Sequence, residues 1–157
     1  MKLSFPIRAF LVFLILSLLA ACGSGKPVRR INPPAVTIQQ LAVQPDGRWQ
    51  IELRIQNFST VPTVFDTVEA SLEIEGANAG SIYVKPALEI PGQSADLVSL
   101  SITPSREAAT RLAETVRSGS FGYQLRGGVT TSEPKNKFPV TQSSRLSPVP
   151  GRADTYR

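Results

Sequence analysis

Hydrophobic and polar residues alternate along much of the chain after residue 34. The clearest run is 49–56, where every odd position is apolar and every even position is polar. A period of two predicts an antiparallel strand that buries one face. Comparable patterns predict further strands at residues 35–43, 67–75, 81–85, 88–90, 95–102, 121–129 and 137–146.

One segment changes to a helical period. Ser105 stands at a favourable N-cap position, Glu107 follows in the first turn, and Gly119 is placed to close the helix. The expected apolar stripe consists of Ala109, Leu112, Ala113 and Val116. We expect a single helix that lies across an edge or an end of a sheet.

Turn signals separate these elements, notably at residues 44–48 and 76–80. About seven short strands at regular spacing and one short helix predict a mainly β fold, an immunoglobulin- or fibronectin-like antiparallel β-sandwich. A small barrel is the alternative. We assign this domain to residues 35–148, and we expect the Pro-, Gly- and charge-rich residues 149–157 to form a flexible tail.

The first residues have a different character. Lys2 and Arg8 precede an apolar run at 9–19, which is too short for a membrane-spanning helix but suits a signal peptide. The run ends in Leu19-Ala20-Ala21-Cys22, which resembles the lipobox of bacterial lipoproteins. The resemblance implies cleavage between Ala21 and Cys22 and acylation of Cys22 with palmitate-type chains. The alternatives are a secretory signal with an incidental Cys, or a short signal anchor.

Residues 22–34 form the expected lipidated N-terminus and tether. Glycine and serine come first and proline follows, so the segment is flexible and then stiffer. Lys26, Arg29 and Arg30 either contact anionic headgroups or only keep the linker soluble. Gly23 stands where Asp would signal inner-membrane retention, so a Gram-negative host would place the protein in the outer membrane, facing the periplasm.

Composition narrows the chemistry. The net charge is +5; two of the 17 basic residues lie in the leader and no acidic one does, so the rest carries 15 basic against 12 acidic residues. These charges form no basic run, so we expect no nucleic-acid partner. The chain has no His, and Cys22 is its one Cys, so the usual general base and the usual zinc ligands are missing.

The carboxylates do not suggest a catalytic pair either. Glu69, Glu73 and Glu75 alternate on the outer face of one predicted strand, which is typical of a solvated surface. Asp46 lies in a turn, where Asp is common for local reasons. We therefore expect no enzyme activity, no cofactor and no metal.

Three short segments carry a family resemblance. They are Gln56-Asn57-Phe58-Ser59, Ile90-Pro91-Gly92 and Tyr123-Gln124-Leu125-Arg126-Gly127. In this order they resemble the late embryogenesis abundant type 2 (LEA-2) domain of water-stress and hypersensitive-response proteins, although only Asn57 matches the family's Asn-Pro-Asn. The resemblance implies a sandwich with one helix. Asn57 is expected to cap a strand end and hold a turn.

Two functions outside catalysis follow from the resemblance. One is a membrane-anchored lipoprotein of the cell envelope that protects against desiccation or stress. The alternative is a module that binds or transfers a lipid or another hydrophobic ligand in a groove between sheet and helix, lined by Leu112, Val116, Phe121 and Tyr123. The same side chains could simply be core. The expected partners are the membrane, through the Cys22 anchor, and a lipid or an envelope protein.

Overall fold

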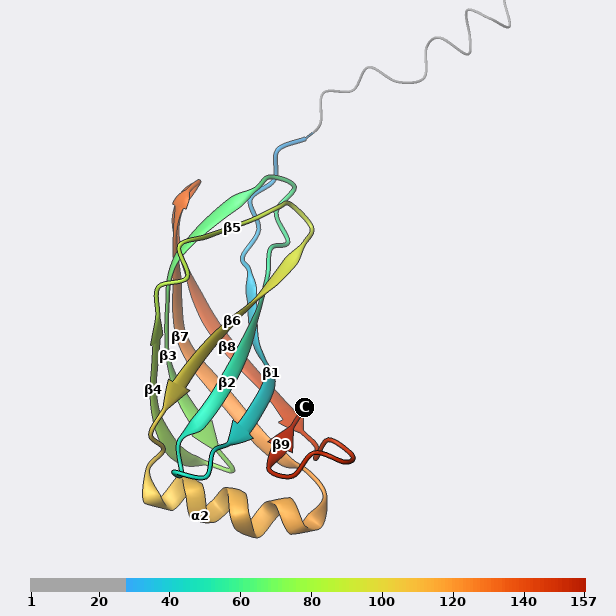
Figure 1. Ribbon diagram of the computed structural model, residues 1–157. Helices are drawn as coiled ribbons and strands as arrows, with labels where there is room; N and C mark the ends of the chain where they lie inside the picture. The colour runs from blue at the N-terminus through green and yellow to red at the C-terminus, as the bar shows by residue number, and fades with distance from the viewer. Residues whose placement is uncertain (1–27) are drawn as a thin grey trace, which may run out of the picture.

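The computed structural model describes residues 28–157, which form two antiparallel sheets packed face to face and one helix across their end (Figure 1). The mainly β sandwich is therefore confirmed, with nine strands in the described residues rather than about seven. The elements are β1 Ala35–Val43, β2 Trp49–Gln56, β3 Thr63–Ile74, β4 Ala77–Val84, β5 Leu88–Ile90, β6 Ala95–Ile102, α2 Arg106–Thr115, a 3-10 turn Val116–Ser118, β7 Phe121–Glu133, β8 Lys135–Leu146 and β9 Thr155–Tyr156.

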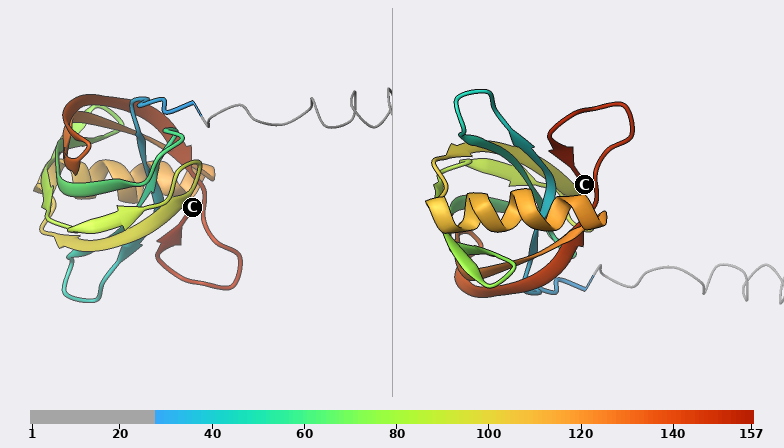
Figure 2. Two further views of the ribbon diagram at one scale, coloured as in Figure 1. Left: turned by 90° about the horizontal axis from the view of Figure 1, so that it is seen from above. Right: turned by 90° about the horizontal axis from the view of Figure 1, so that it is seen from below.

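The strand order is β6-β2-β1-β9 in one sheet and β4-β3-β7-β8 in the other, with β5 paired to the start of β3. Seen along the long axis, the two sheets enclose a common interior (Figure 2). The period of two in β2 does what it predicts: its odd positions are buried and its even positions are half-buried. The largest fully buried side chains are Trp49, Phe65 and Phe121.

The helix begins and ends as its sequence predicts. Ser105 is the N-cap, and its Oγ accepts a hydrogen bond from the Ala108 N–H at 3.1 Å. Gly119 ends the following 3-10 turn with φ 108°, a left-handed conformation that favours glycine. The buried face is shifted by one position from the expected stripe, because Ala108 and Leu112 are buried while Ala113 is exposed.

The predicted turn at 76–80 is wrong. Strand β4 already begins at Ala77, and the reversal is made by Glu75 and Gly76, with φ 47° and 79°. Positive φ at both central residues is the geometry of a tight two-residue hairpin. Ala77 and Ala79 are in fact buried core residues. The turn was predicted because small residues between two glycines are typical of turns.

The end of the chain is also not a loose tail. Residues 155–156 form β9, in which Tyr156 pairs with Leu41 and Thr155 with Ala42 of β1. Tyr156 is 6% exposed, and its ring meets that of Phe121 edge to face, with centroids 5.2 Å apart. Backbone pairing with β1 and burial of the Tyr156 ring therefore hold a segment whose composition alone favours a tail.

Candidate functional site

Asn57 organises the loops at one end of the sandwich. It is 1% exposed, and its Nδ2 donates to the carbonyls of Val61, Ile90 and Pro91 at 3.0, 3.0 and 3.2 Å. Its Oδ1 accepts from the Ser59 N–H at 2.9 Å. This single side chain therefore joins the loop after β2 to the loop after β5. The predicted structural role of Asn57 is confirmed, since its polar atoms are used inside the fold.

The second motif meets the first at this point. A Cβ added to Gly92 would lie 2.7 Å from the carbonyl carbon of Thr60, so only glycine lets the two loops approach this closely. Gln93 adds bonds from its Nε2 to the carbonyls of Phe58 and Ser59 at 2.6 and 3.2 Å. We call residues 57–62 and 91–94 the tether-end loops.

Residues 28–32, which the sequence assigned to a free tether, lie against these loops. The Thr60 N–H donates to the Arg30 carbonyl at 3.0 Å, and the Arg30 N–H donates to the Thr60 Oγ1 at 2.9 Å. Asn32 donates from Nδ2 to the Phe58 carbonyl at 2.8 Å. This part of the expected tether is thus held on the domain by bonds that no local pattern in the sequence reveals.

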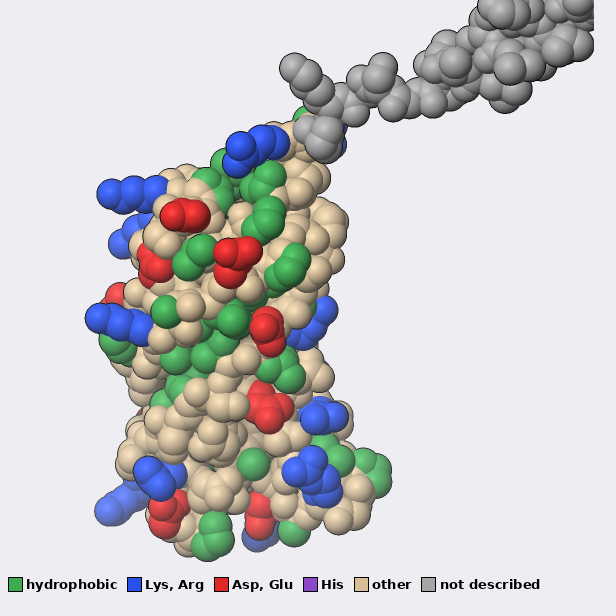
Figure 3. Space-filling model, turned by 45° about the horizontal axis from the view of Figure 1, so that its top comes forward, with side chains coloured by type: hydrophobic (Ala, Val, Ile, Leu, Met, Phe, Trp, Pro, Cys, Tyr) green, Lys and Arg blue, Asp and Glu red, His purple; other side chains and the backbone are tan. Residues whose placement is uncertain are grey.

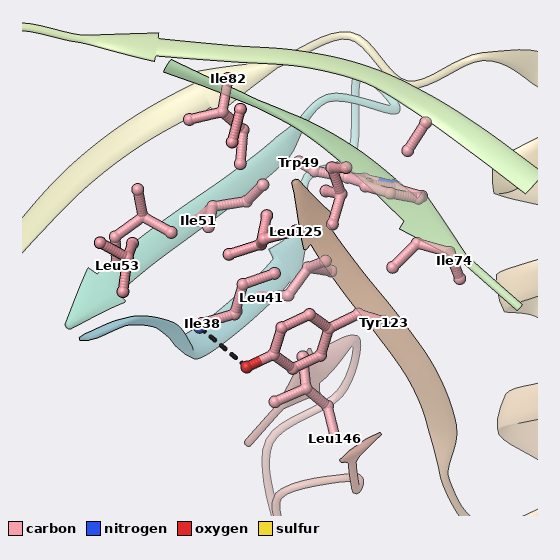
Figure 4. Close-up of a cluster of buried hydrophobic side chains, with 14 of the residues drawn as sticks. Ile38, Leu41, Trp49, Ile51, Leu53, Ile74, Ile82, Tyr123, Leu125 and Leu146 are labelled. Atoms are coloured by element: carbon pink, nitrogen blue, oxygen red, sulfur yellow. Dashed lines mark hydrogen bonds between the residues drawn. The ribbon is translucent and has the colours of Figure 1, made fainter. Parts of the chain in front are cut away.

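In the third motif, Tyr123 and Leu125 point into the interior of the sandwich (Figure 4). The Tyr123 hydroxyl accepts a hydrogen bond from the Ile38 N–H at 3.1 Å and so links the two sheets. Burial raises the pKa of Tyr123 above its usual value. Gly127 faces Ala70 of β3, and a Cβ there would lie 2.0 Å from the Glu69 carbonyl oxygen. The first and last residues of the motif therefore both position β7, Tyr123 against β1 and Gly127 against β3.

The four residues expected to line a ligand groove belong to the core. Leu112, Phe121 and Tyr123 are 4%, 0% and 4% exposed, and Val116 packs half-buried against the same cluster. The structure places all four in or against one hydrophobic core cluster. Their side chains are covered by neighbouring core residues, so they do not line an open groove, and this correction removes the site on which the ligand-binding alternative depends.

Ala21 and Cys22, the expected cleavage and acylation site, lie outside the described residues. Within residues 28–157 no helix has the length and apolar character needed to cross a membrane. The same part of the chain contains no cluster of three or more potential metal ligands.

The outer faces of the sheets carry shallow hollows lined by both polar and apolar groups. One, of about 590 Å³, lies over Gly127 and Gly128, and its charged side chains are Glu69, Arg126 and Lys137. Because acidic and basic side chains both line this hollow, it favours neither an anionic nor a cationic ligand. Glu69 and Glu73 lie on the outer side of β3, as predicted, but Glu75 lies in the hairpin turn that follows the strand. The Glu75 carboxylate accepts a hydrogen bond from the Gly122 N–H and lies beside Arg145.

A feature that the sequence analysis missed is the apolar surface at the end of the domain where residue 28 lies. Of the five large hydrophobic side chains exposed in residues 28–157, Val28, Ile31 and Phe58 belong to the tether-end loops or to the segment bonded to them, at 64%, 48% and 46% exposure. The sequence offered one signal for this surface, which is Phe58, an aromatic residue between the polar residues Asn57 and Ser59.

No family model matches the chain, and no curated protein matches it. Among solved structures, the solution structure of AT1g01470 from Arabidopsis thaliana has a TM-score of 0.50 at 9% identity, over 84% of this chain and 88% of that one. The solution structure of "a putative late embryogenesis abundant (LEA) protein At2g46140.1" has a TM-score of 0.49 at 13% identity, over 95% and 87%. A protein from Archaeoglobus fulgidus gives 0.42 at 12%, over 76% and 98%. At 9% identity, the similarity to the first structure shows a shared fold and carries no statement about function.

Proposed function

We propose that this chain is a lipid-anchored, non-enzymatic lipoprotein of the cell envelope, whose LEA-2-like domain protects against desiccation or related stress. The observation that carries the proposal is Leu19-Ala20-Ala21-Cys22 at the end of an apolar segment. Val28, six residues after Cys22, is already bonded to the domain, because its carbonyl accepts a hydrogen bond from Thr60 Oγ1. In a Gram-negative host the domain would face the periplasm from the outer membrane.

The LEA-2-like assignment is supported by where the three motifs lie. Asn57 bonds the carbonyls of Ile90 and Pro91, so the first two motifs hold one another. The third sets the close approach of β7 to β3 at Gly127. Motifs that are short and separated in sequence therefore act together in one fold, which is what a shared domain family would require.

The non-enzymatic reading is supported by the use of the buried polar side chains. Asn57, Ser59, Thr63, Thr131 and Thr155 are the buried polar residues of the described chain, and each makes hydrogen bonds within the protein. All of these bonds run to backbone groups, so none of the five side chains is paired with a second nucleophilic or titratable side chain, as a nucleophile and its base would be. The buried polar side chains of residues 28–157 therefore stabilise the fold.

Intact-mass spectrometry of the full chain, expressed in a bacterial host and purified from membranes, tests the anchor. The expected mass is that of residues 22–157 with added acyl groups, and the protein should fractionate with membranes. Cys22→Ser is the matched control and should yield no acylated species. An unmodified Cys22 in the wild-type protein would refute the proposal.

The protective role needs a separate test. We expect the purified domain to slow the aggregation of a client enzyme during drying and rehydration. The control is an unrelated folded protein of equal mass concentration. No effect at several-fold molar excess would count against protection. Native mass spectrometry of the same sample should show the bare polypeptide, whereas a retained lipid would favour the ligand-binding alternative.

A further inference from the structure

We propose that the tether end of the domain, formed by residues 28–32 and the tether-end loops, docks on the lipid surface that holds the anchor. The occupant is the bilayer leaflet carrying the acyl chains of Cys22, so this inference rests on the proposed function. It adds an orientation: the tether end faces lipid and α2 faces away.

Chain length supports this placement. Only six residue steps separate Cys22 from Val28, and even fully extended they span on the order of 20 Å. The domain starts at the end opposite α2 (Figure 1). Because residues 28–32 are bonded to the loops, they add nothing to the reach of the tether. An acylated Cys22 therefore keeps this end close to the membrane.

The surface at this end has the chemistry of a lipid contact. Val28, Ile31 and Phe58 are exposed apolar side chains, and Arg29 and Arg30 are exposed between the first two. The ion pairs of residues 28–157 are Arg48–Asp46 and Arg145–Glu75, so both of these Arg side chains are available to headgroup phosphates. Figure 3 shows Lys or Arg beside the start of the described chain, with acidic side chains further along the same face.

The apolar side chains are held in position rather than left on a loose loop. The Phe58 carbonyl accepts bonds from Asn32 Nδ2 and Gln93 Nε2, and the Thr60 Oγ1 donates to the Val28 carbonyl at 2.7 Å. Preorganised groups lose little entropy on contact, and the anchor supplies a high effective concentration. Weak contacts are therefore sufficient to orient the domain.

The test uses the full lipidated protein in vesicles of phosphatidylcholine and phosphatidylglycerol. Cys22 is the only Cys of the chain and is blocked by lipid, so Phe58→Cys provides one thiol for an environment-sensitive fluorophore. Leu97→Cys, on β6 and exposed to 49%, is the matched control. We expect the probe at 58 to shift to the blue and to be quenched by brominated lipid several-fold more than the probe at 97.

A second variant links the shift to the proposed surface. Replacing Val28 and Ile31 with Ser, and Arg29 and Arg30 with Gln, should abolish most of the shift at 58 while the protein stays acylated and membrane-bound. Equal probe responses at 58 and 97, in protein whose mass shows acylation, would overturn the docking and leave the anchor intact. A mass without acyl groups would overturn both.

Discussion

The two ends of the sandwich are closed by different kinds of interaction. At the helix end, α2 covers the sheets with the buried side chains of Ala108 and Leu112. At the tether end no helix is present among the described residues, and Asn57 joins the loops by directional hydrogen bonds. Apolar packing tolerates changes that conserve volume, whereas a buried hydrogen-bond network tolerates few changes. The tether end should therefore be the more sensitive to small chemical changes.

The largest effect is expected for Asn57→Ala. The change leaves the carbonyls of Val61, Ile90 and Pro91 without their donor, and it should lower the free energy of unfolding by about 3 kcal/mol. Urea denaturation measures the loss. The control is Asn78→Ala, whose exposed side chain accepts one bond from the Gly80 N–H and should cost under about 1 kcal/mol. Equal losses would contradict the role given to Asn57.

At the helix end, Leu112→Ala should lower the free energy of unfolding by roughly 2–3 kcal/mol, because it opens a cavity beneath α2. Leu112→Met keeps the volume and should cost less than about 1.5 kcal/mol. Leu97→Ala removes the same side chain from an exposed position and should change stability by less than about 0.5 kcal/mol. If Leu112→Met lowered the free energy of unfolding as much as Leu112→Ala, the helix end would not be held by apolar packing alone.

Tyr123→Phe tests the polar link between the sheets. Losing the hydroxyl leaves the Ile38 N–H unpaired and should cost about 1–2 kcal/mol at neutral pH. Burial raises the pKa of Tyr123, so above pH of about 10 the unfolded state ionises first and stability falls as pH rises toward the folded pKa. Thermal melts from pH 8 to pH 11 should show a smaller alkaline loss in the variant.

Part of the alkaline loss should remain in that variant. Burial, with a contribution from the Asp154 charge, also raises the pKa of Tyr156. The control is Tyr83→Phe, which removes the hydroxyl of an exposed tyrosine. A Tyr123→Phe variant with the full wild-type alkaline loss would show that Tyr123 does not contribute.

The smallest effect is expected for Ser105→Ala. It removes the N-cap acceptor of α2 and the bond from Ser105 Oγ to the Asn78 carbonyl at 2.6 Å, at a cost of about 1 kcal/mol. Thr110→Ala, on the exposed face of the same helix, should be neutral within about 0.5 kcal/mol. Chemical denaturation of both variants decides whether the cap matters.

Local pattern was sufficient where one strand face is buried and the other is not. The bounds 35–43, 49–56, 88–90 and 95–102 agree with β1, β2, β5 and β6. Strand β3 begins four residues earlier than predicted, since Thr63 pairs with Ile90 of the short strand β5. That pairing depends on a segment more than 20 residues away along the chain, which a local window does not contain.

The candidate site shows the same division. The sequence grouped Leu112, Val116, Phe121 and Tyr123, and all four are in or against the same core cluster. Apolar residues line a groove if their outer side is open, and they belong to the core if other residues pack over them. The pattern within one segment does not reveal which distant residues pack over it. Tyr156 covers part of this cluster from residues that had been assigned to a flexible tail.

The sequence by itself determined the β class, the single capped helix and the predicted anchor at Cys22, because periodicity, capping residues and a lipobox-like segment are local properties. Only the tertiary structure decided how two segments outside the main strand pattern are held. Residues 28–32 and 155–156 are ordered by bonds to the tether-end loops and to β1, contacts distant along the chain. Such contacts stabilise a segment only after the rest of the domain has brought their partners into place.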